Sequence, residues 1–419
     1  MYGVALCPDC GYHRVEMAAQ VSMLSEFAWD DRYRLSGTEE VLTPALLVYP
    51  DFIASNIERT LVLLDGDANR WRVHIKTAKL SHTIRMLIER GVRYFKCATT
   101  LELLVACQDG AGDVLLAYPS IGANARRARE IAEQFPEVRI SVLAENDEQI
   151  RQWSGSRMGV FLDINPGMNR TGIEPERSQQ VLSLIRAIGD AGLEFRGLHY
   201  YDGQYAALDE RARTEAAHQG YDCLLELTTE IERDGVPVPE VITAGTPTLL
   251  SSLSYESFRG RGFIHRVSPG TIVYCDATSL SQIPSDGYRP AVLILSRIVS
   301  RPRRGTVTCD AGHKAVSADS GVPTCLVVGH PELRALAPSE EHLPLTLGKP
   351  TAGLEVGETL YLLPRHVCPT VNNFDCALLV VDGQIQSVEK VSARGREAPL
   401  LRLLDTAAVS GRPATVQKI

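Results

Sequence analysis

A lysine at the end of a short apolar segment is the first residue of this sequence that could do covalent chemistry. Residues 71–76 have the length and composition of a buried β-strand, and Lys76 is the last of them. In a barrel of alternating strands and helices, reactive side chains project from the carboxyl ends of strands. Apolar walls there disfavour the charged ammonium group and free the amine for a Schiff base with a carbonyl compound. A solvated lysine at a strand end is the alternative that position alone leaves open.

Two further residues that could do chemistry, His366 and Cys368, are separated by one residue near the other end of the chain. On a strand, residues i and i+2 face the same side, so both side chains would reach one ion. Imidazole with thiolate favours zinc over magnesium, and two protein ligands leave open the positions that a catalytic metal needs. Asn372, Asn373 and Asp375 could supply outer oxygens. A coincidental pair on a half-buried strand is the alternative.

Two segments of small residues suit an anion. Residues 244–248, Ala-Gly-Thr-Pro-Thr, follow an apolar run and begin a helix, so the backbone at Gly245 and the hydroxyl of Thr246 could hold a phosphate. Residues 165–172 contain one arginine, Arg170, that could face an anion or an aromatic ring nitrogen. Tyr200 and Tyr201 end another run and offer stacking and acid-base groups, although buried aromatic residues there are often only core. Residues 244–248 and 165–172 could equally be plain turns without a ligand.

Eight short apolar runs alternate with helical segments over the first two thirds of the chain, as in a (β/α)8 barrel. Helical periodicity is clear in residues 124–135 and 176–189. A doubly wound sheet is the alternative, but no G-x-G-x-x-G follows the first strand. The expected strands are residues 71–76, 94–98, 113–117, 139–144, 158–164, 195–200, 241–244 and 266–274.

After about residue 285 the pattern changes to strands without long helices between them. This predicts a C-terminal β domain, with Asp382-Gly383 as a tight hairpin turn. The expected strands are residues 292–299, 306–309, 358–363 and 377–381, joined by residues 45–48. We therefore divide the chain into an extension (1–40), a barrel (41–276, with 41–50 joining the β domain), the β domain (277–400) and a tail (401–419).

Composition excludes several classes of protein. The 419 residues carry a formal charge of −8 without a basic run, which argues against nucleic acid as a partner. No apolar stretch is long enough to span a membrane, and the N-terminus does not read as a secretory signal, so a soluble cytoplasmic protein is expected. Ten cysteines are too dilute for a disulfide scaffold. We interpret Cys7 and Cys10 as an incidental pair rather than a metal or redox site.

The segment around Lys76 resembles a known family. Residues 72–79, Arg-Val-His-Ile-Lys-Thr-Ala-Lys, are similar to the R-P-H-x-K-T-H-K segment of the D-serine dehydratase and D-threonine aldolase family. The likeness covers residues from about 40 to 390 in matching order. It implies the fold of alanine racemase, a barrel that binds pyridoxal 5′-phosphate (PLP) followed by a β domain. Further matching segments are residues 43–45, 167–172, 269–276, 310–315, 341–342 and 366–372, with Ser317 and Asp319.

The resemblance also assigns roles. Lys76 would bind PLP covalently, Arg170 would face its ring, and Gly245 with Thr246 would hold its phosphate. Tyr201 would be a catalytic pocket residue, and His366 with Cys368 would bind Zn2+ or another divalent metal such as Mn2+. Val73 and Ala78 depart from the family's proline and second histidine, and the phosphate segment is poorer in Gly and Ser than usual. Further residues expected to contact the cofactor are His74, Tyr200, Tyr274 and Asp276.

These parts imply a lyase that acts on a small D-3-hydroxy amino acid. PLP is an electron sink for Cα, Lys76 is a base for the Cα proton, and the metal is a Lewis acid at the β-hydroxyl. The Cys-containing pair resembles the D-serine dehydratases, which favours β-elimination to a 2-oxo acid and ammonia. The alternatives are a D-threonine aldolase-type cleavage to glycine and an aldehyde, a 3-hydroxy-D-aspartate lyase, an amino-acid racemase and a non-catalytic PLP carrier. A homodimer is expected from the family alone.

Overall fold

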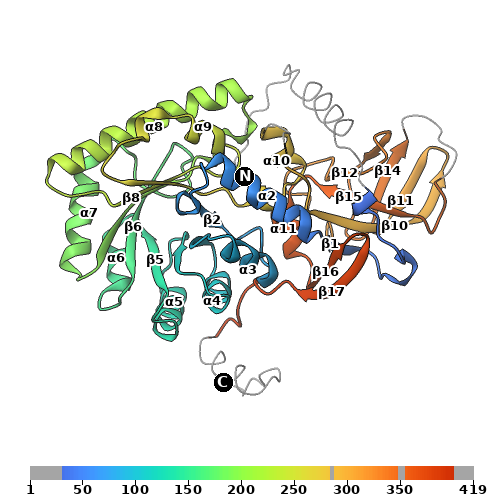
Figure 1. Cartoon of the computed structure of the whole chain (residues 1–419), viewed down its shortest axis with the longest axis horizontal. Helices are drawn as coiled ribbons and strands as arrows, with labels where there is room; N and C mark the ends of the chain where they lie inside the picture. The colour runs from blue at the N-terminus through green and yellow to red at the C-terminus, as the bar shows by residue number, and fades with distance from the viewer. Residues whose placement is uncertain (1–30, 284–286, 348–353, 401–419) are drawn as a thin grey trace. The chain divides into compact units, whose positions relative to one another are not determined.

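The computed structural model describes residues 31–283, 287–347 and 354–400, whose elements are shown in Figure 1. They form two compact units. One contains Phe52 and the described residues before it, with Tyr274–Val388, and the other contains Ile53–Val273 with the described residues from Glu389 onward. Cys7 and Cys10 lie outside the described residues.

The larger unit is the expected (β/α)8 barrel. Its eight parallel strands follow one another in chain order, and a bridge between Trp71 and Val267 brings the last strand back to the first, so the barrel is nearly closed. The prediction of a barrel over a doubly wound sheet is confirmed. The strands are β2 (Arg72–His74), β3 (Tyr94–Cys97), β4 (Asp113–Leu116), β5 (Arg139–Ala144), β6 (Gly159–Ile164), β7 (Glu194–Tyr200), β8 (Glu240–Thr243) and β9 (Ile264–Val267).

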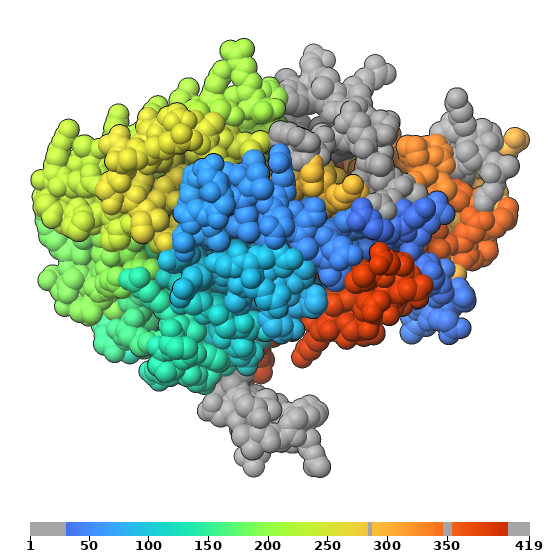
Figure 2. Space-filling model, in the orientation of Figure 1, coloured from blue at the N-terminus to red at the C-terminus, as the bar shows by residue number. Residues whose placement is uncertain are grey.

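Helices connect these strands and cover the outside of the barrel, and the longest of them, α8, runs along its surface (Figures 1 and 2). Several begin at side chains that accept a hydrogen bond from the first turn, namely Thr99, Asn146 and Asp209. Among the described residues, no helix is both long and apolar enough to cross a membrane. The helices are α2 (Pro50–Leu63), α3 (Ser81–Glu89), α4 (Thr100–Gln108), α5 (Ala123–Gln134), α6 (Asp147–Trp153), α7 (Ser178–Asp190), α8 (Glu210–Arg233) and α9 (Leu249–Leu253).

Side chains that alternate along the strands fill the barrel interior in layers. The middle layer is an apolar cluster of Leu115, Leu143, Phe161 and Ile242, each 2% exposed or less. Two residues earlier, β4 and β8 carry Asp113 and Glu240, and the interior becomes ionic there. Two residues later, β6 carries Asp163, which belongs to a polar layer. The polar layer lies toward the carboxyl ends, where the reactive side chains of a barrel belong.

The ionic floor, as we call the lower layer, consists of Arg72, Asp113, Arg196, Glu240 and Arg266, all nearly inaccessible to solvent. Arg72 Nη1 lies 2.7 Å from Asp113 Oδ1, and its Nε lies 2.9 Å from Glu240 Oε1. Arg196 forms the second ion pair of Asp113, and Arg266 forms that of Glu240. Burial alone would raise the pKa of Asp113, but Arg72 and Arg196 outweigh it and hold that pKa below its ordinary value.

Breaking this floor should destabilise the fold. Glu240→Gln keeps the side-chain shape but leaves Arg266 without its carboxylate partner, in a layer that already holds three cations and two anions. We expect the free energy of unfolding to fall by about 3–5 kcal/mol, measured by urea denaturation. The matched control is Glu215→Gln on α8, whose side chain is 59% exposed and pairs with Arg211, and whose effect should stay within about 1 kcal/mol. Equal effects of the two changes would contradict a stabilising floor.

The smaller unit is built on a nine-stranded sheet, as expected for the β domain. Strand β1 pairs with β10 and β16, and Asp382 and Gly383, both with positive φ, form the predicted turn between β16 and β17. Two short helices, α10 (Ala277–Gln282) and α11 (Val367–Asn372), accompany the sheet. The strands are β1 (Ala45–Val48), β10 (Val292–Arg303), β11 (Thr306–Cys309), β12 (Cys325–Val327), β13 (Leu333–Ala335), β14 (Leu343–Leu347), β15 (Thr359–Pro364), β16 (Cys376–Val381) and β17 (Gln384–Lys390).

The last expected barrel strand, residues 266–274, extends beyond the observed strand, and this part of the prediction was wrong. Strand β9 ends at Val267, and Thr271–Val273 form a 3-10 turn. Pro269 has no N–H to continue the ladder, and a Cβ at Gly270 would lie 2.2 Å from the carbonyl oxygen of His74. The chain must therefore leave the sheet here.

Candidate active site

Three cationic side chains meet around the ring of Tyr201 at the carboxyl ends of the barrel strands. Lys76 lies in the turn after β2, Lys96 near the end of β3, and Arg170 in the loop after β6. Their Nζ, Nζ and Cζ atoms lie 5.6, 5.5 and 5.2 Å from the centroid of the Tyr201 ring. Within the described part of the chain, none of the three forms an ion pair with a carboxylate. This concentration of positive charge suits an anionic ligand.

The loop that carries Arg170 is held in shape by its own side chains. Asn165 Oδ1 accepts hydrogen bonds from the backbone N–H of Gly167 and of Asn169, each at 3.0 Å. Gly172 has a φ of +100°, and a Cβ there would lie 2.7 Å from the nitrogen of Asn165. Only glycine fits this close approach, so the predicted glycine-bounded loop is a built turn that presents Arg170 to the barrel mouth.

Lys96 is a site residue that the sequence reasoning missed. It is 2% exposed, and its Nζ lies 3.3 Å from Nε2 of His199, whose Nδ1 lies 2.7 Å from Oδ1 of Asp163. The register pairs Lys96 with His74, so both side chains stand in the same polar layer. The available signal was the alternation of residues 94–98, which places Lys96 on the same face as Tyr94 and therefore inside the barrel.

Burial controls the protonation of this polar layer. Desolvation, followed by the charge of Lys76, lowers the pKa of Lys96 from 10.5 to about 7. Desolvation also lowers the pKa of His199, with Lys96 as the next cause, and that of His74, with Lys76 as the next cause. Both imidazoles are therefore neutral at pH 7. His74 Nδ1 accepts a hydrogen bond from the backbone N–H of Lys76 at 3.3 Å, which helps fix the turn that carries this lysine.

The expected phosphate segment packs against the same tyrosine. A Cβ at Gly245 would lie 2.9 Å from Cε2 of Tyr201, so the ring lies directly on the backbone at this position. Thr246 Oγ1 accepts a hydrogen bond from the backbone N–H of Ile272 at 3.2 Å, which joins the loops that follow β8 and β9. These two loops are the ones that hold phosphate in many barrels of this architecture.

Three of the other expected cofactor contacts have different neighbours within their own units. Tyr200 points outward, because a Cβ on Gly220 of α8 would lie 2.2 Å from its hydroxyl, so its role is packing against that helix. Tyr274 and Asp276 belong to the smaller unit. Asp276 Oδ1 accepts from the backbone N–H of Ser279, and its Oδ2 accepts from that of Val367, which makes it the cap that joins α10 to α11.

His366 and Cys368 do not lie on a strand, and that prediction was wrong. His366 is the N-cap of α11, and Cys368 lies in its first turn, where Pro369 is tolerated because the first-turn N–H groups have no helical partner. The two side chains nevertheless meet, and the hydrogen bond to Cys368 helps to raise the pKa of His366 to about 9 against the effect of burial. Within the described ranges, no group of three or more His, Cys, Asp or Glu residues could hold a metal ion.

Asp319 is the outer partner of this pair. Its Oδ2 lies 2.6 Å from Nδ1 of His366. Because a carboxylate only accepts, Nδ1 carries the hydrogen and Nε2 faces away from Asp319. This is the carboxylate-histidine arrangement that orients metal ligands. Asn372, Asn373 and Asp375 were expected to supply the outer oxygens, whereas the residue in contact with His366 is Asp319.

Comparison with known families agrees with both units. The family described as "Alanine racemase, N-terminal domain" matches residues 48–278, more than half of the chain, and "Putative serine dehydratase domain" matches residues 291–380. The chain belongs to the D-serine dehydratase and D-threonine aldolase family. Members of this family have the fold of the alanine racemase-like, fold-type III PLP enzymes, and the structure shows that fold here.

Several relatives of this chain are lyases. A 3-hydroxy-D-aspartate aldolase of Paracoccus denitrificans (strain Pd 1222) is 26% identical over 377 residues, covering 85% of this chain and 93% of the relative. The solved D-threonine aldolase from Filomicrobium marinum has a TM-score of 0.77 at 27% identity and covers 85% of this chain and 96% of its own. D-threo-3-hydroxyaspartate dehydratase from Delftia sp. HT23 has a TM-score of 0.71 at 20% identity, covering 84% and 98%, a likeness of fold. The chain is accordingly a PLP-dependent lyase.

The barrel mouth of this lyase fits PLP. The coenzyme carries a phosphate and a ring oxygen, and Lys76, Lys96 and Arg170 supply positive charge around one aromatic ring. Gly245 has no side chain that would separate the backbone of its loop from the ring of Tyr201. These features match the amine, cation and small-residue loop that a phosphorylated aldehyde requires.

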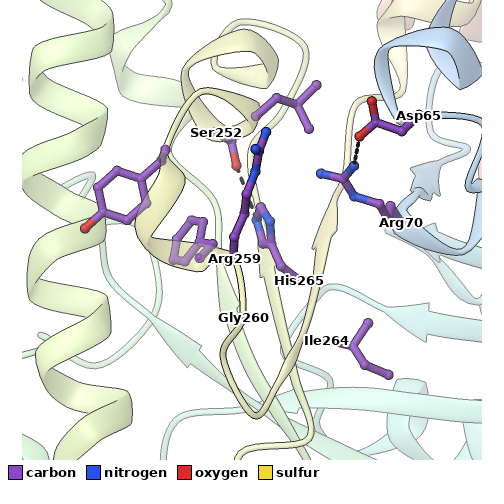
Figure 3. Close-up of a pocket in the computed structure, with 10 residues that line it drawn as sticks. Asp65, Arg70, Ser252, Arg259, Gly260, Ile264 and His265 are labelled. Carbon is purple, nitrogen blue, oxygen red and sulfur yellow. Dashed lines mark hydrogen bonds and ion pairs between the residues drawn. The ribbon is translucent and has the colours of Figure 1, made fainter.

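A separate cavity of about 470 Å3 lies elsewhere in the barrel unit (Figure 3). Residues of α9, of the segment that follows it and of the start of β9 line this cavity. Arg70, which also lines it, pairs with Asp65 at 2.8 Å. Desolvation lowers the pKa of His265 there to about 3, so this imidazole is neutral and bonds to Thr243. None of the expected site residues lines this cavity, and we assign it no role in the reaction.

Proposed function

We propose that this lyase catalyses β-elimination of a D-3-hydroxy amino acid, with D-serine as the model substrate, to give a 2-oxo acid and ammonia. The observation that carries the proposal is the pairing of His366 with Cys368, backed by Asp319 at 2.6 Å. A thiolate-containing donor pair suits zinc, a Lewis acid for departure of a β-hydroxyl. The family resemblance associates that pair with dehydratases.

Lys76 has two tasks in this proposal. Its amine would attach the coenzyme covalently, and the freed amine would then take the proton from Cα of the substrate. Bound PLP supplies the electron sink that makes this proton acidic. The backbone N–H of Lys76, bonded to neutral His74, fixes the turn from which the amine extends.

The other residues of the mouth orient and neutralise. Arg170, held by the Asn165 turn, would face the coenzyme ring, and Gly245 with Thr246 would hold the phosphate. Close contacts hold the ring of Tyr201 in place, since a Cβ at Gly203 would lie 2.5 Å from its hydroxyl and a Cβ at Gly245 would lie 2.9 Å from its Cε2. A ring confined in this way can pack against a ligand without reorganising.

His366 and Cys368 would hold the divalent metal, and Asp319 would orient the imidazole for it. In the metal-free protein His366 keeps its proton at neutral pH because its pKa is about 9. Binding of a metal at Nε2 would therefore release that proton.

Aldol cleavage is the second candidate function, and the relatives favour it. The D-threonine aldolase from Filomicrobium marinum and the 3-hydroxy-D-aspartate aldolase of Paracoccus denitrificans both resemble this chain over most of their length. Removal of the hydroxyl proton instead of loss of hydroxide would break the bond between Cα and Cβ and give glycine and an aldehyde. The same lysine and the same metal pair would serve either outcome.

A product assay separates the two reactions. The protein, reconstituted with PLP and Zn2+, is incubated with D-serine, D-threonine and D-3-hydroxyaspartate, and with the L-isomers as controls. We expect a 2-oxo acid and ammonia in equal amounts from at least one D-substrate and none from its L-isomer. Glycine and aldehyde as the only products would assign the enzyme to the aldolases, and absence of 2-oxo acid from all three D-substrates would end the elimination proposal.

A further inference from the structure

Burying a lysine costs free energy unless its amine is paired. The barrel contains two buried lysines, Lys79 and Lys96, and they differ in whether a carboxylate pairs with the amine. Lys79 is 5% exposed, and its Nζ lies 2.6 Å from Oε1 of Glu102 and donates to the carbonyl oxygen of Ala393. Lys96 is 2% exposed and has no such carboxylate within the described part of the chain. Its hydrogen-bond partner is the neutral ring of His199. Lys79 is thus satisfied by the fold, whereas Lys96 is not.

The direction of the hydrogen bonds beneath Lys96 is fixed. Asp163 can only accept, so Nδ1 of His199 carries the hydrogen and Nε2 offers a lone pair. Lys96 therefore donates to His199, and it can do so as an amine or, more strongly, as an ammonium ion. Its remaining N–H groups are free to serve a ligand on the side of Tyr201, where the ring centroid lies 5.5 Å away.

We propose that Lys96 is a further coenzyme-binding residue, which takes up a proton when the anionic coenzyme enters the barrel mouth and then balances its charge. The proposal rests on the PLP site described above. An anion placed among Lys76, Lys96 and Arg170 favours the charged form of each. Lys96 is the member that can respond, because desolvation and Lys76 hold its pKa at about 7 in the free protein.

The titratable groups around Lys96 decide whether a pH dependence of ligand affinity can be assigned to this lysine. The two imidazoles have lowered pKa values and stay neutral above pH 7. Desolvation raises the pKa of Asp202, whose carboxylate accepts from Thr248 and Tyr221. The titratable or charged groups that face Lys96 are Arg72, His74 and Lys76 from β2 and the turn after it, Asp163 from β6, Arg170 from the loop after β6, and His199, Tyr201 and Asp202 from β7 and the loop after it.

The test uses pyridoxine 5′-phosphate, which lacks the aldehyde and so cannot react with Lys76. Its affinity is measured by calorimetry from pH 6 to pH 9 for the wild type, Lys96→Arg and Lys96→Met. For the wild type, affinity should fall by up to tenfold per unit above pH 7 relative to Lys96→Arg, which stays charged throughout. Lys96→Met should bind about ten- to a hundredfold more weakly than wild type at pH 6.5 and approach it at pH 9. Titration of the ligand itself is common to all three proteins and cancels.

Proton uptake gives an independent readout. At pH 7.5 a lysine with a pKa of about 7 is about one quarter protonated, so binding should take up about three quarters of a proton in the wild type beyond that in Lys96→Arg. The heats in two buffers of different ionisation enthalpy report this number. Parallel pH profiles and equal uptake for the wild type and Lys96→Arg would overturn the proposal while leaving the coenzyme site intact. If the wild type binds neither pyridoxine 5′-phosphate nor PLP, the site and the proposed function fail together. The comparison with Lys96→Arg decides the matter even if Lys96→Met does not fold.

Discussion

Replacing Lys76 by alanine should abolish covalent binding of PLP and lower kcat/KM for the D-hydroxy amino acid by at least about a thousandfold. The amine is expected to serve both as the attachment point and as the base, so both functions disappear in one variant. Fixation of the coenzyme by borohydride, followed by mass spectrometry of the labelled peptide, measures the first effect, and turnover measures the second. The unfolding temperature should change little, since Lys76 is not part of an ion pair among the described residues.

Lys79→Ala is the matched control for this experiment. Lys79 lies three residues along the same segment, but it pairs with Glu102 inside the protein. Its loss leaves Glu102 buried without its cation, so stability should fall by about 3 kcal/mol while borohydride still links the coenzyme to residue 76. A labelled peptide that contains Lys96 or Lys79 in place of Lys76 in the wild type would contradict the assignment.

The elements of the barrel could be predicted from the sequence because its strands are short apolar runs separated by clear helical periodicity. Residues 139–144 were predicted as β5 with both ends correct. The errors occurred where local pattern and tertiary contact disagree. Residues 266–274 look like one apolar strand, but the close approach of Gly270 to the carbonyl of His74 ends the strand early, and that contact joins residues far apart in the chain.

The site was predicted less completely than the fold, and for a similar reason. Lys76 was expected at the end of a strand, and Arg170 and Tyr201 were expected in or beside segments with recognisable residue types. The structure brings the three side chains together. Lys96 lies inside a strand whose composition shows only a core segment. Asp319 lies 47 positions from His366, and nothing local to either residue indicates their contact at 2.6 Å. Such partners become visible only when the fold places them side by side.

The contact between Asp319 and His366 makes the metal proposal testable. Removing a candidate ligand and removing the outer carboxylate should lower zinc binding and turnover to different degrees. Cys368→Ala removes a ligand, so the protein should lose bound zinc and its turnover should fall by about a thousandfold while PLP stays bound. Asp319→Ala keeps both ligands but frees the imidazole, so zinc affinity should fall by about ten- to a hundredfold and excess zinc should restore turnover.

Cys376→Ala is the control for loss of a thiol, since Cys376 is an exposed cysteine at the start of β16 and should affect neither metal content nor rate. Metal content is measured by elemental analysis, and PLP occupancy is measured by visible absorbance of the same samples. A Cys368→Ala protein that retains stoichiometric zinc and full activity would place the metal elsewhere. If Asp319→Ala matches Cys368→Ala and excess zinc rescues neither, Asp319 acts on the fold of this segment instead of on the imidazole. The graded result is expected because His366 Nδ1 donates to Asp319, which leaves Nε2 and the sulfur of Cys368 as the atoms that would bind the ion.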